Sequence, residues 1–131
     1  MLKRIALIFL FSAGAVHAKP SLWSFERVDQ GLFDVGVAWG VKENCSYISE
    51  NKLRGIGFLL RLSNYAMEQG YSRAEVRAFV KDPVEKAKLR KRVTKYFQDQ
   101  GLDPNVSDAL CSFGDAAIKS QTQVGKLLSR N

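Results

Sequence analysis

Histidine is nearly absent from this chain of 131 residues, and its absence excludes several kinds of chemistry. The single histidine, His17, lies in an N-terminal segment that we expect to be removed. Without histidine, the remaining chain cannot build a Ser-His-Asp or Cys-His catalytic site, a His-ligated metal site or a neutral-pH histidine switch. Aspartate, glutamate, lysine, tyrosine and serine are present, but their spacing forms no catalytic pattern. We therefore predict no catalytic residue, no metal and no cofactor.

Long apolar runs are also scarce, and the one that stands out is at the N-terminus. Residues 1–18, MLKRIALIFLFSAGAVHA, combine a basic start, a short apolar core and small residues at Val16 and Ala18. This order is typical of a secretory signal peptide. Beyond it, no run approaches the roughly 20 apolar residues of a membrane-spanning helix. We predict cleavage after Ala18 and a soluble periplasmic or secreted product, with a retained membrane anchor as the minor alternative.

Cysteine occurs twice, as Cys45 and Cys111. An even number of cysteines in an exported protein predicts a disulfide. The alternative is a redox pair, for which we would expect Cys-x-x-Cys spacing rather than this wide separation. Closing a loop of about 66 residues would stabilise the fold by roughly 4 kcal/mol.

Cleavage would leave 113 residues, which is enough for one domain but too few for two ordinary ones. We divide the chain into a signal peptide (1–18), a lead-in segment (19–28) and a helical domain (29–131). The aromatic residues Trp23 and Phe25 of the lead-in segment are expected to pack on the domain. The predicted fold is all-α, a small single-domain bundle of about five helices stapled by one disulfide.

Residues 33–41, FDVGVAWGV, alternate apolar and small or polar residues as a strand does. A lone strand leaves its backbone groups unpaired, and no later run of strand length alternates in the same way. A helix from about Asp29 to Asn44 needs no partner. It would place Gly36 and Gly40 where another helix could approach, which would offset a cost of about 1 kcal/mol for each glycine. We predict a helix that ends just before Cys45, so that the disulfide ties the first helix to the last; the strand remains the alternative.

Two further helices are predicted after this one. Residues 52–68 are apolar around most of a helical circumference, so we expect the central, most buried helix there, ending near Gly70. Close helix packing is the interpretation of the glycines in Gly55-Ile56-Gly57. Ser72 and Glu75 form a capping box that begins a short helix over residues 73–81.

The remaining helices follow two Asp-Pro pairs, which are typical of helix starts. Asp82-Pro83 begins a helix that stops at Gly101. Asp103-Pro104 is predicted to begin a last helical region, 104–128. Its candidate breaks are Gly114 and Gly125, and its predicted inner face consists of Ala109, Leu110, Phe113, Ala117 and Ile118.

One helix carries a dense group of basic residues, which gives a candidate binding face made of Lys88, Lys91, Arg92 and Lys95. A basic amphipathic helix docks on anionic lipid or on an acidic partner. The predicted partners are therefore an acidic envelope protein or an anionic membrane surface, and for an exported protein not a nucleic acid. The alternative is a solvated face that keeps the domain soluble. The oligomeric state is not predicted.

Several segments carry a family resemblance. They are GYS-x-x-E-V-x-A-F-V (residues 70–80), the two cysteines, and S/T-x-V-G-x-L-L at Thr122–Leu128, together with the basic stretch EKAKLRKRVTKYF. The chain resembles a family of small exported alphaproteobacterial proteins with a domain of unknown function. The resemblance covers most of residues 19–131 and implies a periplasmic helical domain with no assigned activity and no known cofactor. It carries no functional residues to transfer.

Three functions are compatible with the sequence. The first is a non-enzymatic interaction module that uses the basic helix or an apolar groove. The second is a periplasmic stress chaperone that exposes apolar surface in acid. The third is a small enzyme with an aromatic cleft and a carboxylate such as Asp29, Asp34 or Glu43.

Overall fold

The computed structural model describes Gly14 and residues 18–131. His17 and most of the predicted signal peptide lie outside the described residues, so cleavage after Ala18 stays a prediction. In chain order the described elements are the 3-10 helix η1 (Leu22–Ser24), α1 (Glu26–Asn44), β1 (Ile48–Glu50), α2 (Lys52–Glu68), α3 (Arg73–Lys81), α4 (Pro83–Asp99), α5 (Ser107–Lys119), α6 (Gln123–Lys126) and β2 (Leu128–Arg130). Within this part of the chain, no helix is both long and apolar enough to cross a membrane.

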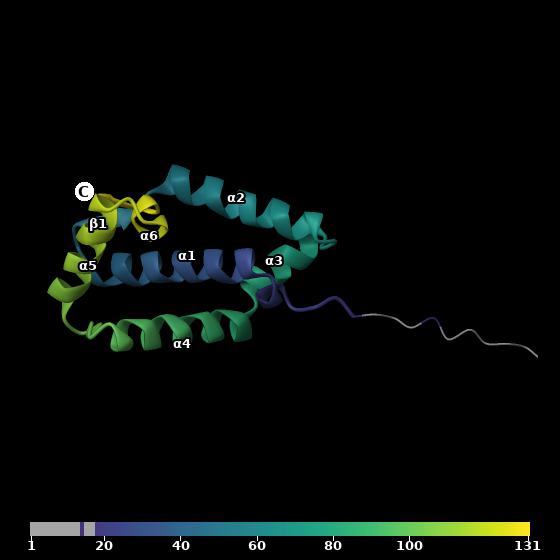
Figure 1. Cartoon of the computed structure of the whole chain (residues 1–131), viewed down its shortest axis with the longest axis horizontal. Helices are drawn as coiled ribbons and strands as arrows, with labels where there is room; N and C mark the ends of the chain where they lie inside the picture. The colour runs from purple at the N-terminus through teal and green to yellow at the C-terminus, as the bar shows by residue number, and fades with distance from the viewer. Residues whose placement is uncertain (1–13, 15–17) are drawn as a thin grey trace, which may run out of the picture.

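Three long helices form the body of the fold, with α1 between α2 and α4 (Figure 1). The short helix α3 connects α2 to α4 at one end. The opposite end is covered by α5, α6 and the C-terminal segment. The predicted all-α bundle stapled by one disulfide is confirmed, although the described chain has six α-helices rather than about five.

The stretch 33–41 lies within α1, so the helix prediction is confirmed and the strand alternative is wrong. The helix begins at Glu26 rather than at Asp29. Its glycines lie where α4 crosses: a β-carbon would be 2.9 Å from Val93 Cγ2 at Gly36 and 2.6 Å from Phe97 Cε2 at Gly40. The close approach of α4 is therefore the packing reason that these two glycines require.

The prediction that residues 52–68 form the central helix is wrong. They do form the helix α2, but it lies on the outside, and its buried residues are Leu62 and Ala66. The central helix is α1, because its glycines allow α2 and α4 to pack closely on two of its sides. A β-carbon at Gly31 would be 2.7 Å from Leu62 Cδ1 on the α2 side, while Gly36 and Gly40 receive α4.

The predicted helix starts at Ser72 and Asp82 are confirmed. Ser72 Oγ accepts from the Glu75 amide at 3.1 Å, and Glu75 accepts from the Ser72 amide at 2.6 Å, so both halves of the capping box are present. Asp82 accepts from the amides of the first turn of α4. Positive φ angles at Gly70 (100°) and Gly101 (69°) follow the ends of α2 and α4, as expected of C-terminal glycines.

The predicted helical region 104–128 is wrong in its start and in its breaks. Asp103 begins a turn instead of a helix, because its carboxylate accepts from the backbone amide of Asn105 at 2.8 Å. The chain then forms α5 and α6, which are separated at Gln121, where φ is 56°. Gly114 lies inside α5, where a β-carbon would be 2.6 Å from Val41 Cγ1. It marks close packing on α1 rather than a break.

The chain also forms a small sheet that the sequence pattern does not predict. Strands β1 and β2 pair antiparallel, with Ser49 opposite Ser129. Each strand has three residues, too few to establish an alternating pattern. Asp115 of α5 fastens this end of the molecule by accepting from Tyr47 at 2.9 Å and pairing with Arg130 at 3.1 Å.

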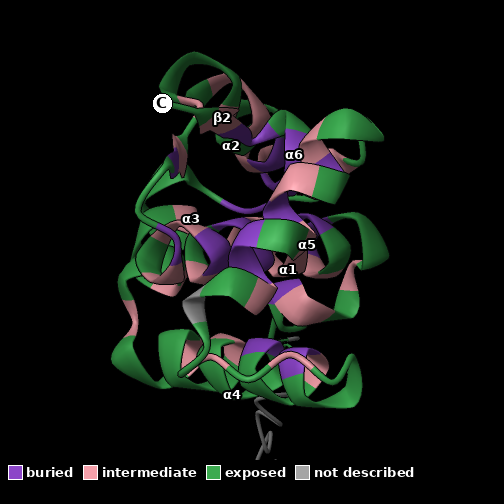
Figure 2. Ribbon diagram, turned by 90° about the vertical axis from the view of Figure 1, so that its left-hand side faces the viewer, coloured by how far each residue is buried: buried purple, intermediate pink, exposed green. Residues whose placement is uncertain are grey.

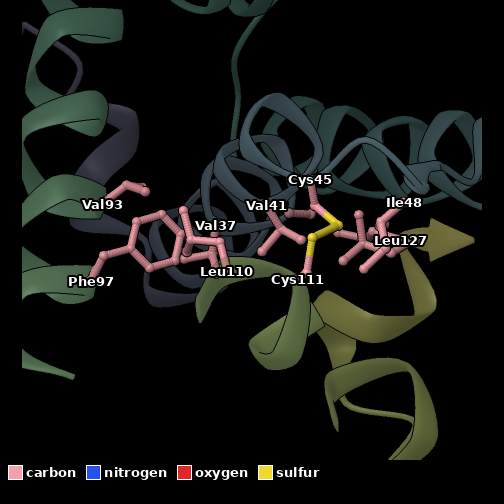
Figure 3. Close-up of a cluster of buried hydrophobic side chains, with 11 residues drawn as sticks. Val37, Val41, Cys45, Ile48, Val93, Phe97, Leu110, Cys111 and Leu127 are labelled. Carbon is pink, nitrogen blue, oxygen red and sulfur yellow. A yellow bond between two sulfur atoms is a disulfide. The ribbon is translucent and has the colours of Figure 1, made fainter. Parts of the chain in front are cut away.

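The disulfide between Cys45 and Cys111 is present, with the two α-carbons 5.1 Å apart. Cys45 directly follows α1, as predicted, and Cys111 lies on α5, so the bond joins the first helix to the fifth rather than to the last. Buried residues lie on α1 and on the parts of the chain next to it (Figure 2), and Figure 3 shows the side chains of Val41, Ile48 and Leu127 beside the bond. Of the predicted inner face of α5, Leu110 and Ala117 are buried, Phe113 and Ile118 pack against this core, and Ala109 is half-buried.

The aromatic residues of the lead-in segment pack on the domain. Trp23 lies edge-on to Phe79, with ring centroids 5.1 Å apart. Phe25 packs edge-on to Tyr71, with ring centroids 5.9 Å apart. Polar contacts hold the same segment: Lys19 pairs with Glu75 at 2.8 Å, Trp23 Nε1 donates to Glu85, and the Tyr71 hydroxyl donates to the Pro20 carbonyl. The lead-in segment is thus attached to α3 and α4.

Candidate functional site: an apolar groove between two helices

The first half of α2 exposes large apolar side chains, and Trp39 on α1 joins them. The exposed fractions are 86% for Leu53, 59% for Ile56, 58% for Leu60, 57% for Trp39 and 41% for Leu59. We call these five residues the apolar face. Single exposed apolar residues are normal, but five on two adjacent helices are typical of an interaction site.

A groove of about 230 Å³ lies between α1 and α2 beside the apolar face. We call it the α1–α2 groove. Most of its surface is apolar, and its lining residues are Val35, Ala38, Trp39 and Lys42 of α1, Glu50 and Asn51, Lys52, Gly55, Ile56 and Leu59 of α2, and Leu127 and Leu128.

The groove exists because α2 packs closely on α1 through its second half. There Leu62 lies against Gly31 and Ala66 is buried. In the first half Gly55 has no side chain, and a β-carbon on it would have none of the described atoms within 4 Å. The start of α2 is held in place nevertheless, since the Asn51 amide donates to the Leu127 carbonyl at 2.8 Å. The hollow is therefore part of the folded structure.

Positively charged side chains lie on both flanks of the apolar face. Lys52 lines the α1–α2 groove, whereas Arg54, Arg61 and Lys126 line a second hollow on the other flank of α2. Within residues 18–131, none of these four cations forms an ion pair. The only acidic residue of α2 is Glu68, at its C-terminal end.

Lys42 differs from the other cations of the rim because its charge is already compensated. It pairs with Glu43 at 3.2 Å, lies 4.0 Å from Glu50, and its ammonium is 4.2 Å from the centre of the Trp39 ring. The cation holds the indole at the edge of the groove by a cation–π contact. Trp39 is thus an oriented but exposed aromatic side chain.

The predicted basic face on α4 is divided by the structure. Lys88 pairs with Glu85 at 3.0 Å and Lys95 with Asp99 at 2.7 Å, both within the helix. Lys91 is exposed, makes no ion pair with another residue of the described chain, and lines a shallow hollow with its neighbours Ala87, Arg90, Thr94, Lys95 and Gln98. All three lysines are exposed.

Arg92, the fourth predicted residue, turns toward α1. Its guanidinium donates to both oxygens of Asp29, at 2.7 and 3.0 Å. It also lies over the rings of Trp23 and Phe33, at 5.5 and 5.4 Å from their centres. Arg92 therefore joins α4, α1 and the lead-in segment, and it is not a free member of the basic face.

The carboxylates that could support an enzyme do not come together. Asp29 is engaged by Arg92 and Glu43 by Lys42, while Asp34 and Glu43 are nine residues apart and so lie on opposite sides of α1. Desolvation raises the pKa of Asp34 above its ordinary value, opposed by a hydrogen bond from Gln30. None of the three lines the α1–α2 groove or the hollows beside α2 and α4. Among the described residues, no three His, Cys, Asp or Glu side chains cluster as metal ligands would.

The sequence contains a signal for the apolar face, but its interpretation as core was wrong. Leu53, Ile56 and Leu60 recur at helical spacing, which indicates one helix face without saying what covers it. The packing interpretation of Gly55 and Gly57 fails in the same way. Gly55 faces open space, and a β-carbon on Gly57 would meet only the Arg61 side chain, at 3.6 Å.

The chain belongs to a family of unknown function (DUF5333), which matches residues 20–129. The resemblance to a family with a domain of unknown function is thereby confirmed. No match to the chain was found among curated proteins or among solved structures.

Proposed function

We propose that this member of the DUF5333 family is an exported, non-enzymatic interaction module that binds a protein partner through the α1–α2 groove and the apolar face. The exposure of the apolar face carries the proposal. Burying an exposed Leu or Ile side chain is worth about 1.5–3 kcal/mol, so covering Leu53, Ile56 and Leu60 would drive association. The groove adds a place for one of the partner's side chains.

Export is supported by the order of residues 1–18 and by the disulfide. A basic start, an apolar core and small residues before Lys19 are typical of a cleaved leader. The bond between Cys45 and Cys111 is of the kind that forms and persists in oxidising compartments. The periplasm or the exterior is therefore the proposed location.

The basic face of α4 supports a second candidate function, binding to an acidic protein or an anionic membrane. Its supporting observation is that Lys91 is exposed and without a carboxylate partner in the described chain. It ranks second because Lys88 and Lys95 already have carboxylate partners. The α2 and α4 surfaces lie on opposite sides of α1, so they can be tested separately (Figure 1).

A chaperone would use the same apolar face but bind many unfolded clients. The exposed side chains Leu53 and Trp39 are compatible with this alternative. The number of partners discriminates between the two functions, because a specific module captures one protein and a chaperone captures a broad set.

The test is photo-crosslinking in living cells that make the protein. A photoreactive residue is placed at Ile56 on the groove, at Thr94 beside Lys91 on α4, or at Ser112, an exposed control position on α5. We expect one dominant protein adduct from Ile56, which weakens when Leu53 and Leu60 are changed to glutamine. The matched control is Lys88→Glu/Lys91→Glu/Lys95→Glu, which spares Arg92 because that side chain holds the fold.

The other outcomes are distinct. A dominant adduct from Thr94 that disappears in the charge-reversed variant would favour the basic face. Many adducts of similar yield from Ile56 would favour a chaperone. No adduct from Ile56 above the level of Ser112 would refute binding through the groove.

A further inference from the structure

We propose that the occupant of the α1–α2 groove is an amphipathic helix of another protein whose apolar stripe is flanked by acidic residues. This inference rests on the proposed function, since it names the partner chemistry of the same site. It goes further because it specifies the shape of the partner segment, a helix, and the sign of its charge, negative.

The shape of the site fits a helix. Leu53, Ile56 and Leu60 lie at i, i+3 and i+7, the spacing of one side of a helix–helix seam. Trp39 of α1 lines the groove together with Ile56 and Leu59 of α2 and supplies an aromatic anchor. A helix packed along α2 could place one apolar side chain in the space beside Gly55, where a β-carbon has no described neighbour within 4 Å.

The charges select the flanks of that helix. Lys52 lies on the groove side of α2, and Arg54 and Arg61, which are seven residues apart, line the other flank together with Lys126. A helix docked on the apolar face would have these cations on its two sides. The other charged residues of the groove, Lys42 and Glu50, lie 4.0 Å apart and offset each other. Acidic residues on its flanks would gain partners there, whereas basic residues would be repelled.

The same charges disfavour a second copy of this chain as the occupant. If two α2 helices packed against each other about a two-fold axis, cation-bearing flanks would meet. The one acidic residue of α2, Glu68, is at the end remote from Lys52 and Arg54. Like charges in close contact oppose association.

A membrane surface is also a weaker fit than a helix. The groove is hollow, with α1 and α2 as walls and Leu127 and Leu128 at one end. A protruding side chain can fill such a hollow, whereas a lipid surface would extend across it. The test below includes vesicles so that the two occupants are distinguished.

The experiment measures binding of two synthetic helical peptides by isothermal titration calorimetry. Both have leucine at i, i+3, i+4 and i+7 along one face; one has glutamate and the other lysine at the flanking positions. The protein is the disulfide-bonded chain 19–131. The charge variant is Lys52→Glu/Arg54→Glu/Arg61→Glu.

A pair of glycine variants tests the groove itself. Gly55→Leu places a side chain in the α1–α2 groove, and Gly57→Leu places the same side chain on the other flank of α2, where only Arg61 is near. Both replace a helical glycine by leucine, so their effects on helix propensity are matched. A difference in binding between them reports on occupancy of the groove.

We expect the wild-type protein to bind the acidic peptide about tenfold more tightly than the basic peptide, because several exposed ion pairs each contribute a small amount. The charge variant should reverse this preference. Gly55→Leu should weaken binding of the acidic peptide about tenfold or more, while Gly57→Leu should change it less than about threefold.

The inference is overturned if wild-type protein shows no preference for the acidic peptide, prefers the basic one, or binds neither at about 1 mM. It is also overturned if vesicles of anionic phospholipid bind through Leu53 and Leu60 while the acidic peptide does not, or if sedimentation shows dimers that Gly55→Leu abolishes. The proposed function has a separate readout. A protein adduct at Ile56 in cells with no acidic preference here would refute this inference alone, whereas the absence of an adduct would refute the proposed function whatever the peptides do.

Discussion

Gly40 of α1 lies against the ring of Phe97 of α4, so close that a β-carbon on Gly40 would be 2.6 Å from Phe97 Cε2 and 3.0 Å from Phe97 Cζ. Phe97 is buried and has little freedom to move away. This contact explains why glycine, which is unfavourable in a helix, is present in the central helix. Because Gly40 has no side chain, α4 can pack close to α1.

The first prediction concerns this contact. Gly40→Ala should lower the free energy of unfolding by up to about 2 kcal/mol, because overpacking costs about 1–3 kcal/mol and the gain in helix propensity offsets only about 1 kcal/mol of it. Gly55→Ala is the matched control and should raise stability by up to about 1 kcal/mol, since its β-carbon has open space. Urea unfolding of both variants measures this. Equal stabilisation by the two substitutions would contradict the packing role of Gly40.

Gly125 should be still less tolerant of substitution. A β-carbon there would be 1.9 Å from the carbonyl oxygen of Ala117, and backbone cannot move aside as a side chain can. We expect Gly125→Ala to displace α6 from α5 and to destabilise the protein by more than Gly40→Ala does. Amide hydrogen exchange at Leu127 and Leu128 should report the loss, and unchanged protection would disprove the assignment.

The disulfide should contribute a large part of the stability. Cys45→Ala/Cys111→Ala should lower the free energy of unfolding by roughly 4 kcal/mol, because the bond closes a long loop in the unfolded chain. Urea unfolding measures the loss, with the reduced wild-type protein as the control. The intact mass of the exported protein should equal residues 19–131 less two hydrogens, and a free-thiol mass would argue against the bond in cells.

Arg92 and Lys95 should differ in their effect on stability although they lie on one helix. Arg92→Ala should destabilise by about 1 kcal/mol, because it removes a two-pronged contact with Asp29 and two ring contacts. Lys95→Ala should change stability by less than about 0.5 kcal/mol, since its ion pair is exposed. Thermal unfolding of the two variants measures the two losses of stability. Equal losses would mean that Arg92 contributes no more to the fold than an exposed surface charge does.

Acid should release the lead-in segment. A hydrogen bond from Lys19 holds the pKa of Glu75 below its ordinary value of 4.5, and a hydrogen bond from Trp23 does the same for the pKa of Glu85. Because both folded-state values are lowered, these contacts stabilise the fold fully above about pH 4.5 and are lost as pH falls through the lower folded-state values. Trp23 fluorescence should change in that range, measured against Trp23→Phe as the blank.

The control for the acid prediction is the pair Glu75→Gln/Glu85→Gln, in which the acid-dependent change should be absent. A wild-type protein whose Trp23 signal is constant from pH 7 to pH 2 would contradict the assignment. Opening of the apolar core over the same range would instead support the chaperone alternative.

Local features were predicted well because their causes are local. The capping box at Ser72 and Glu75 and the Asp82 cap each depend on hydrogen bonds within a few residues, so the pattern determines the helix start. The helix over residues 33–41 and the pairing of Cys45 with Cys111 were also correct. A helix needs no distant partner for its backbone, and two cysteines allow one intramolecular pairing.

The C-terminal region was predicted less well because its conformation depends on distant contacts. Strand β2 exists because β1, far away in the sequence, offers it backbone groups to pair with. Asp103 has the residue type of a helix cap, yet it closes a turn with Asn105. Both conformations are compatible with the local sequence, so local propensity could not choose between them.

The candidate site was decided by tertiary structure. Hydrophobic periodicity identified Leu53, Ile56 and Leu60 as one face of a helix, and that much follows from the sequence. It did not say whether the face is covered, because an apolar side chain has the same spacing in a core and at an interface. The tertiary packing of the glycines decided it. Gly31, Gly36 and Gly40 let α2 and α4 pack closely on opposite sides of α1, so α1 is the central helix and the apolar side of α2 is exposed to solvent.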